Sequence, residues 1–343
     1  IIAIGSGVIN DISKIVANVS GKPYIIVSLR EWKTIPIFEA ELAKYKGKKL
    51  ELKNAEQAHA AEEALKNAKY VVSEATKKER KRKAAPPFTT SSLQQEANKK
   101  LNFTAKKTMM VAQQLYEGVS LGKSSVGLIT YMRTDSVNLS SLAINTAKAA
   151  ILSEYGEAYH KARQYQTKSK NAQEAHEAIR PTYMNVEKAG ANNDERRLYD
   201  LIRKRAIASQ MADAETDTTR VEVAMSDSPY LWVANYSVIT FDGFMRVYTQ
   251  SSDDELSAQL STLNSQLSVG VCALSIATAQ ESFTKPPLRY DEGSLVEKMK
   301  DLGIGRPSTY ATVIETIQSR GYVERGNVEG ASREYNVLTL SKN

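Results

Sequence analysis

Apolar and polar positions alternate along the first part of the chain with the two-residue period of strands that bury one face. The alternation predicts strands at 35–42, 50–53 and 70–74, with a helix at 55–66. A run of seven charged residues, 77–83, follows and is closed by the proline pair Pro86-Pro87. Because this run has no apolar face to bury, we interpret it as an exposed linker.

The pattern becomes predominantly helical from about residue 89 to residue 211. The expected helices are 93–101 after a Thr90 or Ser91 cap, 106–116 after Thr104, 141–155 after Ser140, and 198–211. Strands return at 220–224, 230–240, 244–248 and 267–278. This order predicts an α+β multidomain fold, in which a helical domain is inserted into a β-rich domain and the chain crosses between them twice, side by side.

The last stretch has the outline of a helix-turn-helix with a wing. A helix is expected at 292–302, followed by a glycine turn and a second helix at 308–320 with Pro307 at its first position. Gly321 would end that helix, and a hairpin at 322–340 would follow. A plainer interpretation, two helices that only complete a core, remains open on these residues alone.

The composition narrows the possible classes. The chain has 343 residues, of which 42% are hydrophobic and 25% charged, which is typical of a globular protein of two or three domains. Its apolar runs are much shorter than a membrane-spanning helix requires, so we expect no membrane partner. Lysine and arginine exceed aspartate and glutamate by 46 to 39, and the net charge of +7 favours a polyanionic partner such as nucleic acid.

Cysteine and histidine contents argue against a metal centre built from these residues. Cys272 is the single cysteine, which excludes an intrachain disulfide and a cysteine-based zinc site and fits a reducing compartment. The three histidines, His59, His160 and His176, lie far apart in the sequence. Because the chain begins at Ile1 without a methionine, we interpret it as part of a longer protein.

A tyrosine in the segment 127–136, GLITYMRTDS, could act as a nucleophile. A short apolar strand is expected to end at Tyr131, with Arg133 two positions later and on the same side if the chain stays extended. An ordinary tyrosine with a pKa near 10 is almost entirely protonated at neutral pH. A neighbouring guanidinium favours the phenolate and can grip a phosphate with two hydrogen bonds. The alternative is a strand-end tyrosine beside a surface arginine.

A second polar cluster lies at 171–182, NAQEAHEAIRPT. His176 could donate a proton to a departing sugar oxygen, and Arg180 could hold a phosphate. The spacing is not that of a zinc-binding HExxH helix. A solvated helix end that stops before Pro181 is the alternative, and the residues alone do not decide between the two.

Five segments together resemble bacterial DNA topoisomerase I, a type IA topoisomerase. They occur in the order of that family, and they are 86–95, 107–116, 127–136, 171–182 and 303–311. Met132 favours this subclass, because topoisomerase III usually has a "TYPRTD" sequence and reverse gyrase "TYHRTD" at the corresponding place. The resemblance extends from about Phe38 to Leu340.

The resemblance implies a ring-shaped enzyme that cuts one DNA strand, passes another through the gap and reseals the cut. Tyr131 matches the nucleophile that becomes joined to a 5′ phosphate, and Arg133 matches the arginine at the scissile phosphate. His176 and Arg180 match the histidine and arginine of the family's "EAHEAIRP" segment near the active site. The family's "GIGRPSTYA" stretch lies on the path of single-stranded DNA, and its matching residues here are Arg306, Ser308 and Thr309.

The family's Mg²⁺ ligands lie in a TOPRIM domain with a "DPDREGE" cluster, and this sequence contains no such cluster. We therefore expect Mg²⁺ to serve the complete enzyme and not to bind this chain specifically. Asp213, Glu215 and Asp217 are spaced two apart but are expected to be solvated. The resemblance implies five parts, which are a poorly matched segment 1–33, the β-rich arch 34–86, the nucleophile domain 87–214, the second arch part 215–285, and a helix-turn-helix segment 286–343 adjoining TOPRIM.

These inferences give a type IA topoisomerase core that relaxes negative supercoils as part of a complete enzyme and is inactive alone. We expect it to be monomeric, bacterial and cytoplasmic, associated with the nucleoid. The alternative is a non-catalytic fragment that binds single-stranded DNA in the same basic groove. A covalent DNA adduct would separate the two. The sequence does not specify the cleavage preference, the source organism, the dynamics of the gate or any zinc modules of the parent chain.

Overall fold

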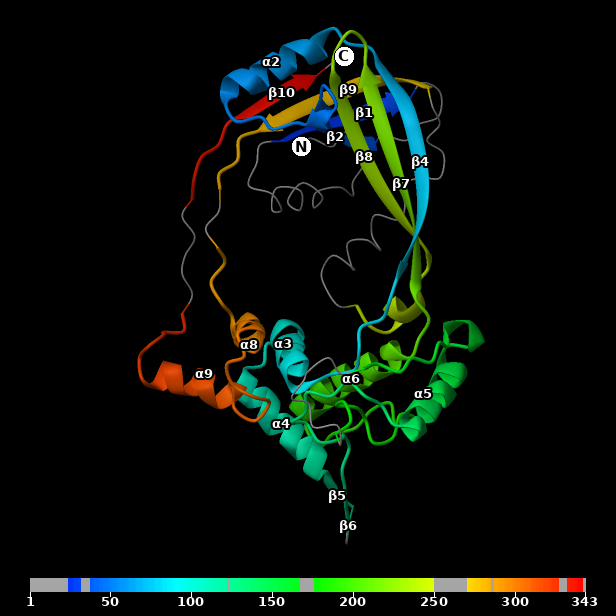
Figure 1. The fold of residues 1–343 in the computed structure, drawn as a ribbon, viewed down its shortest axis with the longest axis vertical. Helices are drawn as coiled ribbons and strands as arrows, with labels where there is room; N and C mark the ends of the chain where they lie inside the picture. The colour runs from blue at the N-terminus through cyan, green and yellow to red at the C-terminus, as the bar shows by residue number, and fades with distance from the viewer. Residues whose placement is uncertain are drawn as a thin grey trace.

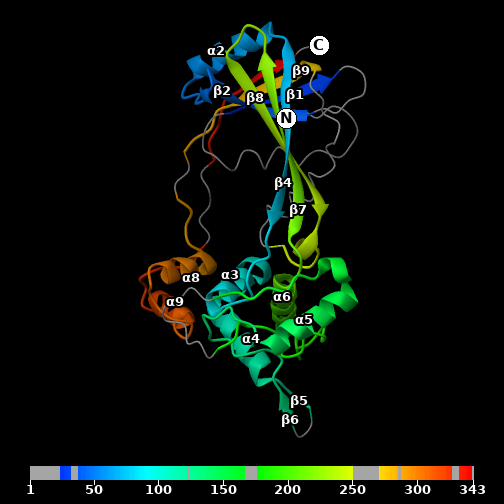
Figure 2. The ribbon, with the colours of Figure 1, turned by 45° about the vertical axis from the view of Figure 1, so that its right-hand side comes forward.

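The computed structural model describes residues 24–31, 38–121, 124–166, 176–249, 270–284, 287–326 and 332–341. Most of the expected segment 1–33 and the middle of the hairpin expected at 322–340 lie outside these residues. Figures 1 and 2 show two masses, an antiparallel sheet at one end and a helical body at the other. No described helix is long and apolar enough to cross a membrane.

The sheet curls until it closes on itself. Its strands, in chain order, are β1 (Tyr24–Glu31), β2 (Phe38–Tyr45), β3 (Lys48–Lys49), β4 (Tyr70–Arg82), β7 (Ala214–Met225), β8 (Tyr230–Phe241), β9 (Gly270–Gln280) and β10 (Val337–Ser341). They are paired in the order β1-β2-β8-β7-β4-β9-β10, and β3 pairs with β2. Because β1, at one end of this row, also pairs with β9, next to the other end, the sheet closes into a ring of strands. Helix α2 (Ala55–Lys66) packs on the sheet, and Leu65, Tyr70 and Trp232 are fully buried between them.

Most of the helical body lies between β4 and β7 in the sequence. Its elements there are α3 (Thr90–Leu101), α4 (Ala105–Glu117), the hairpin β5 (Val119–Leu121) and β6 (Ser124–Val126), α5 (Ser141–Glu154), the 3₁₀ turn η1 (Glu157–Tyr159) and α6 (Asn193–Ser209). The 3₁₀ turn η2 (Gly243–Arg246), which follows β8, adds Phe244 to the same core. The caps predicted from sequence are confirmed for α4 and α5, where Thr104 and Ser140 accept backbone N–H bonds. The cap of α3 is Thr89, one residue before the predicted Thr90.

The last two helices belong to the helical body, and the chain then returns to the sheet. Helices α8 (Glu292–Asp301) and α9 (Tyr310–Ser319) pack near α3 and α4, with Val296 and Tyr310 buried against Ala105. Gly321 follows α9 with a positive φ of 69°, as the sequence predicts for a helix end. Beyond it, β10 pairs with β9 in the sheet. The described residues 281–284 and 287–291, after β9, and 320–326 and 332–336, before β10, lie between the sheet and α8 and α9, on the side opposite β4 and β7 (Figure 1).

The hairpin predicted at 322–340, and with it the wing, is wrong. In the described part of this stretch, the only strand is β10, whose partner is β9 and not a neighbouring strand of a local hairpin. The apolar residues Val337, Leu338 and Leu340 suit a place in the sheet, where they lie opposite residues 277–280 of β9. The pairing ties the end of the described chain back to its beginning, since β9 also carries β1.

The charged run at 77–83 is not a linker, because most of it extends β4. The register along β4 and β7 continues to Arg82, which pairs with Ala214. On one face of this ladder, Lys77 contacts Asp217 and Lys81 contacts Glu215, each with 2.6 Å between nitrogen and oxygen. The charges therefore find opposite charges across the strands, which an isolated sequence window cannot show. Asp217 and Glu215, expected to be solvated, are correspondingly ion-paired.

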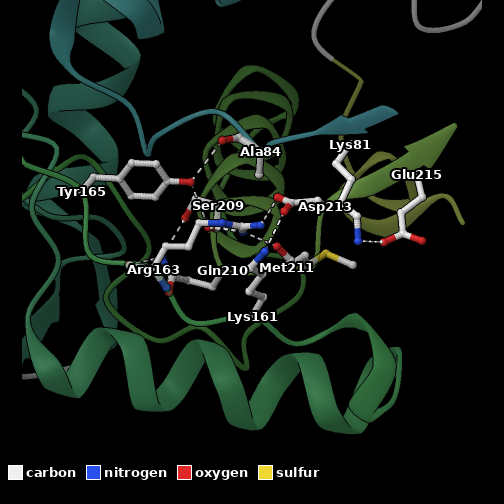
Figure 3. A network of polar contacts seen from close by, with 10 residues as sticks. All are labelled: Lys81, Ala84, Lys161, Arg163, Tyr165, Ser209, Gln210, Met211, Asp213 and Glu215. Carbon is white, nitrogen blue, oxygen red and sulfur yellow. Dashed lines mark hydrogen bonds and ion pairs between the residues drawn. The ribbon is translucent and has the colours of Figure 1, made fainter. Parts of the chain in front are cut away.

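A network of polar contacts fastens the bases of β4 and β7 to the helical body (Figure 3). The hydroxyl of Tyr165 donates to the carbonyl of Ala84 just after β4, and the guanidinium of Arg163 contacts Asp213 just before β7. Lys161 contacts the second oxygen of the same carboxylate at 2.7 Å. Asp213 is therefore buried and paired, contrary to the expectation that it is solvated.

The strand expected at 244–248 is wrong, because the 3₁₀ turn η2 takes its place. Gly243, the first residue of this turn, has a φ of 48°, and a Cβ there would collide with the backbone of Ala212 and Asp213. The hairpin of β5 and β6 precedes the nucleophile segment. The poorly matched first segment contributes β1 to the sheet.

Candidate active site

Tyr131 follows a short extended segment that lies along a second one. The backbone N–H of Thr130 donates to the carbonyl of Arg180 at 2.9 Å, and Ile129 forms an antiparallel bridge with Pro181. The regular strand predicted here is wrong, because the flanking N–H groups bond elsewhere: that of Leu128 donates to the carbonyl of Leu115, and that of Arg180 to the hydroxyl of Thr130. The two segments that sequence analysis singled out separately are nevertheless brought together.

Tyr131 and Arg133 are both exposed, whereas the residues that alternate with them are buried. Met132 and Thr134 are buried in the helical body, Arg133 is exposed and Tyr131 is 38% exposed. The chain bends at Met132 and Arg133, so it is not extended here. The expectation that the phenol and the guanidinium share one side, which assumed an extended chain, therefore stays a prediction.

Two rings flank the phenol of Tyr131. The ring of Tyr116 meets it edge to face with 5.4 Å between ring centroids, and the imidazole of His176 lies at 5.8 Å. Tyr116 belongs to the last turn of α4, which ends immediately before the hairpin that leads to Tyr131. Sequence analysis gave Tyr116 no role, although it closes the segment 107–116 that carries part of the family resemblance. These contacts fix the ring while leaving the phenol accessible.

His176 lies in extended chain and not at the end of a helix. Two residues later, the N–H of Ala178 donates to the carbonyl of Asn138 at 2.9 Å, and Ile179 bridges Phe88. The segment thus runs between two parts of the helical body and carries His176, which is partly buried, to Tyr131. The interpretation as a solvated helix end is wrong.

Arg180 is mostly buried and already engaged. Its side chain is 11% exposed, contacts Glu177 at 2.5 Å and donates to the carbonyl of Pro181 at 2.8 Å. Burial by itself raises the pKa of the Glu177 carboxyl, but the hydrogen bonds from Ser140 and Arg180 outweigh it and hold that pKa below its usual value. Arg180 therefore holds the His176 segment in place, and only a rearrangement would free its whole guanidinium for a phosphate.

Arg306, Ser308 and Thr309 lie in the turn between α8 and α9, and all three are exposed. Helix α9 begins at Tyr310, so the prediction that Pro307 starts the helix is wrong by three positions. The hydroxyl of Thr309 accepts the N–H of Arg306 at 2.8 Å, which closes the turn instead of capping the helix. The guanidinium of Arg306 donates to the carbonyl of Gly305, its neighbour in the chain.

Electrostatic coupling shows that this turn lies near the Tyr131 segment. Burial raises the pKa of the Asp135 carboxyl, and the charges of Lys300 and Arg306 act against that rise. Burial likewise raises the pKa of the Tyr310 hydroxyl, with Asp135 adding to the increase. Asp135 follows Tyr131 by four positions, so Arg306 and Tyr310 lie within electrostatic range of the nucleophile segment.

The acidic residues of the described chain do not make a Mg²⁺ site. Among the residues with described positions, no three histidine, cysteine, aspartate or glutamate side chains gather closely enough to hold a metal ion. Asp213, Glu215 and Asp217 each form an ion pair with a lysine or arginine side chain. The donor set that Mg²⁺ prefers, several free oxygens around one point, is therefore not found in this part of the molecule.

The arrangement as a whole combines an accessible phenol, an exposed guanidinium two residues later and an imidazole against the phenol ring. A phenol oxygen can form a covalent bond to phosphorus, and a guanidinium can stabilise the charge on the other phosphate oxygens. An imidazole can carry a proton to or from an oxygen nearby. The chemistry best suited to these three groups is transfer of a phosphoryl group to tyrosine.

Comparison with known proteins gives matches over most of the chain. The sequence pattern of one family, described as DNA topoisomerase, matches residues 12–334. DNA topoisomerase 1 of Rickettsia bellii is 46% identical over 296 residues, which cover 84% of this chain and 37% of that protein. DNA topoisomerase 1 of Xylella fastidiosa is 43% identical over 314 residues, covering 86% of this chain and 38% of that protein.

The fold is also similar to a solved structure. Full-length topoisomerase I from Thermotoga maritima superimposes with a TM-score of 0.68 at 35% sequence identity. The superposition covers 89% of this chain and 48% of that one. The chain thus spans well under half the length of the two curated relatives and about half of the solved structure.

Proposed function

Because the chain belongs to the bacterial DNA topoisomerase I family, we propose that it supplies the nucleophile-bearing core of a type IA enzyme that relaxes negatively supercoiled DNA. The observation that carries the proposal is the placement of Tyr131. Its phenol is accessible, Arg133 two residues later is exposed, and His176 lies against its ring. DNA, single-stranded at the cut, is the proposed substrate.

In the proposed reaction, the phenol oxygen of Tyr131 attacks phosphorus in line with the departing 3′ oxygen. The bond from tyrosine oxygen to phosphorus forms, the bond from phosphorus to the 3′ oxygen breaks, and the phenolic proton is lost while the 3′ oxygen gains one. His176 is the proposed donor of that proton. Arg133 stabilises the charge that accumulates on the phosphate oxygens in the transition state.

The phosphotyrosine bond retains the energy of the broken phosphodiester, so resealing needs no ATP. The 3′ hydroxyl attacks the same phosphorus in reverse and releases Tyr131. Between the two steps, a second strand passes through the gap. We propose that the helical body is a domain inserted into the arch. We also propose that the arch, together with the remaining domains of the complete enzyme, closes the ring through which strands pass.

Mg²⁺ would act only in the complete enzyme, through acidic ligands of a TOPRIM domain outside this sequence. No step proposed for the residues of this chain depends on it. We further propose that the chain alone cuts no DNA, that the enzyme acts as a monomer, and that it works in the bacterial cytoplasm. Arg306, with Ser308 and Thr309 beside it, is proposed to contact single-stranded DNA near Asp135.

The rival function is binding of single-stranded DNA without cleavage. The exposed Arg133 and Arg306 support binding but do not require the phenol of Tyr131. The two functions are separated by mixing this chain with a separately produced TOPRIM domain, labelled single-stranded DNA and Mg²⁺, and by looking for a covalent adduct on a denaturing gel. An adduct at Tyr131 supports the topoisomerase. Tight DNA binding by the mixed proteins without any adduct supports the rival.

A further inference from the structure

The N–H and the hydroxyl of Thr90, the first residue of α3, both bond to the loop that carries Tyr131 and Arg133. Its side chain is fully buried, with 0% exposed. The hydroxyl of Thr90 donates to the carbonyl of Met132 at 2.7 Å and accepts the N–H of Thr134 at 2.9 Å. The N–H of Thr90 donates to the carbonyl of Thr134, also at 2.9 Å. These three bonds engage the peptide groups on both sides of Arg133.

The helix end that carries Thr90 is itself rigidly placed. The preceding Thr89 caps α3 by accepting the N–H of Ser92, and the hydroxyl of Ser92 accepts the N–H of Thr89 in return. A reciprocal cap of this kind fixes the first turn of a helix. Because the first turn of α3 is fixed independently of the loop, the bonds from Thr90 restrain the loop relative to α3.

A second threonine holds the other flank of the loop. The hydroxyl of Thr130 donates to the carbonyl of Ala178 at 2.7 Å and accepts the N–H of Arg180 at 3.0 Å. Thr130 thus ties the residue before Tyr131 to the segment that carries His176. The two threonines restrain different parts of the loop. Thr130 bonds to the segment that carries His176, whereas Thr90 bonds to the peptide groups around Arg133.

We propose that Thr90 is a positioning residue for DNA cleavage, whose hydroxyl aligns Arg133 with the phenol of Tyr131 at one phosphate. This inference rests on the proposed function. Thr90 touches neither DNA nor the reacting atoms in this account, and it acts only through the two peptide groups beside Arg133. Alignment of a guanidinium with a phosphate is sensitive to small displacements, because both of its hydrogen bonds depend on the direction of the fork.

The test compares variants of the complete enzyme, produced from the full reading frame around this chain, on a labelled single-stranded oligonucleotide. Thr90→Val keeps the shape of the side chain but removes the hydroxyl, and Thr90→Ser keeps the hydroxyl. Thr108 in α4 provides a matched control, since it is also fully buried but its hydroxyl bonds within its own helix, to the carbonyl of Thr104 at 2.9 Å.

We expect Thr90→Val to lower the rate of covalent adduct formation at saturating DNA by about ten- to a hundredfold, with the dissociation constant for the oligonucleotide changed less than about twofold. Thr90→Ser should recover most of the rate, and Thr108→Val should cleave like the parent. In an Arg133→Ala background, Thr90→Val should add little further loss, because the group that Thr90 positions is already gone.

Several outcomes would overturn the proposal. Parental cleavage by Thr90→Val, a loss by Thr90→Ser equal to that of Thr90→Val, or an undiminished loss in the Arg133→Ala background would each do so. If Thr90→Val does not fold, Thr90→Ala replaces it with the same expectation, and failure of both to fold would make Thr90 a residue of the fold alone. Absence of any adduct from the parent enzyme would instead contradict the proposed function, which keeps the two failures distinguishable.

Discussion

The imidazole of His176 lies 5.8 Å from the phenol ring of Tyr131, centroid to centroid, with the two planes inclined by 32°. The two residues come from segments far apart in the chain, joined by the bond from the N–H of Thr130 to the carbonyl of Arg180. The juxtaposition places a group that can carry a proton beside the proposed nucleophile. It leads directly to a test of the role of His176.

Replacing His176 with glutamine in the complete enzyme should slow single-strand cleavage by about a hundredfold, the lower range for loss of a general acid or base. Binding of single-stranded DNA should be retained, because the amide adds no charge and fills a similar volume. Cleavage of a labelled oligonucleotide, followed over time, measures the rate. The matched control is His59→Gln, since His59 is exposed on α2 and pairs only with Glu62 among the contacts seen there. Equal slowing in both variants, or none in His176→Gln, would remove His176 from the proposed reaction.

Arg133 should be only partly replaceable by lysine. Lysine keeps the positive charge but loses the planar fork that can hold two phosphate oxygens, so Arg133→Lys should cleave about tenfold more slowly than the parent. The comparison uses single-turnover cleavage in the complete enzyme. Arg246→Lys serves as a control, because Arg246 is an exposed arginine paired with Asp242. Parental rates for Arg133→Lys would show that the contact is purely electrostatic or is not made.

The sequence predicted those features whose contacts lie within a few residues of one another, and it failed where the contacting residues are far apart in the chain. The caps at Thr104 and Ser140 were correct, because a cap involves only the next three residues. The charged run 77–83 was misinterpreted because its partners, Asp217 and Glu215, lie on a strand more than a hundred residues away. The wing was wrong for the same reason, since β10 pairs with the distant β9.

The candidate site shows the same division. The family resemblance identified Tyr131, Arg133 and His176, and the structure brings Tyr131 and His176 together and leaves Arg133 exposed. It could not assign a role to Thr90 or Tyr116, whose importance lies in contacts across the helical body. Nor could it show that Arg180 is already paired with Glu177, because charge counts treat every arginine as available.

Because of Asp213, the free energy of unfolding of the chain should fall as the pH is lowered into the acidic range. Burial alone raises the pKa of its carboxyl, but the hydrogen bond from Lys161 and the charges of Arg163 and Lys161 outweigh burial and hold the pKa below the usual 3.8. A depressed folded-state pKa contributes stability that is present above the unfolded value and is lost as pH falls through the folded value. At pH 7, Asp213→Asn should therefore lower the free energy of unfolding by about 3 kcal/mol, since it leaves Arg163 buried without its charged partner.

Urea unfolding of this chain at pH 7 and at about pH 3 measures the effect, and the gap between Asp213→Asn and the parent should shrink at the lower pH. Asp200→Asn is the control. Its pair with Lys204 is solvent-exposed on both sides, so the change should cost less than about 1 kcal/mol. A gap that stays constant with pH would mean that the Asp213 contacts contribute no charge-dependent stability.

This chain alone should bind single-stranded DNA with marked salt dependence and relax no supercoils, with or without Mg²⁺. Each of Arg133 and Arg306 should contribute about 0.7 to the slope of log affinity against log salt, whereas Arg180→Gln should change the slope little, because Arg180 is paired with Glu177. Fluorescence titrations at several salt concentrations and a plasmid assay measure the two properties. Relaxation by the purified chain, or binding that ignores salt, would contradict the prediction.

The most direct test of the central claim is the covalent adduct formed by Tyr131. In the complete enzyme, Tyr131→Phe removes a single oxygen and leaves the ring contacts with Tyr116 and His176 possible. The parent should become linked to the 5′ phosphate of a cleaved oligonucleotide, with the DNA attached to the peptide that contains Tyr131. Tyr131→Phe should bind the same oligonucleotide, form no adduct and relax no plasmid. An adduct on any other residue, or relaxation by Tyr131→Phe, would contradict the account.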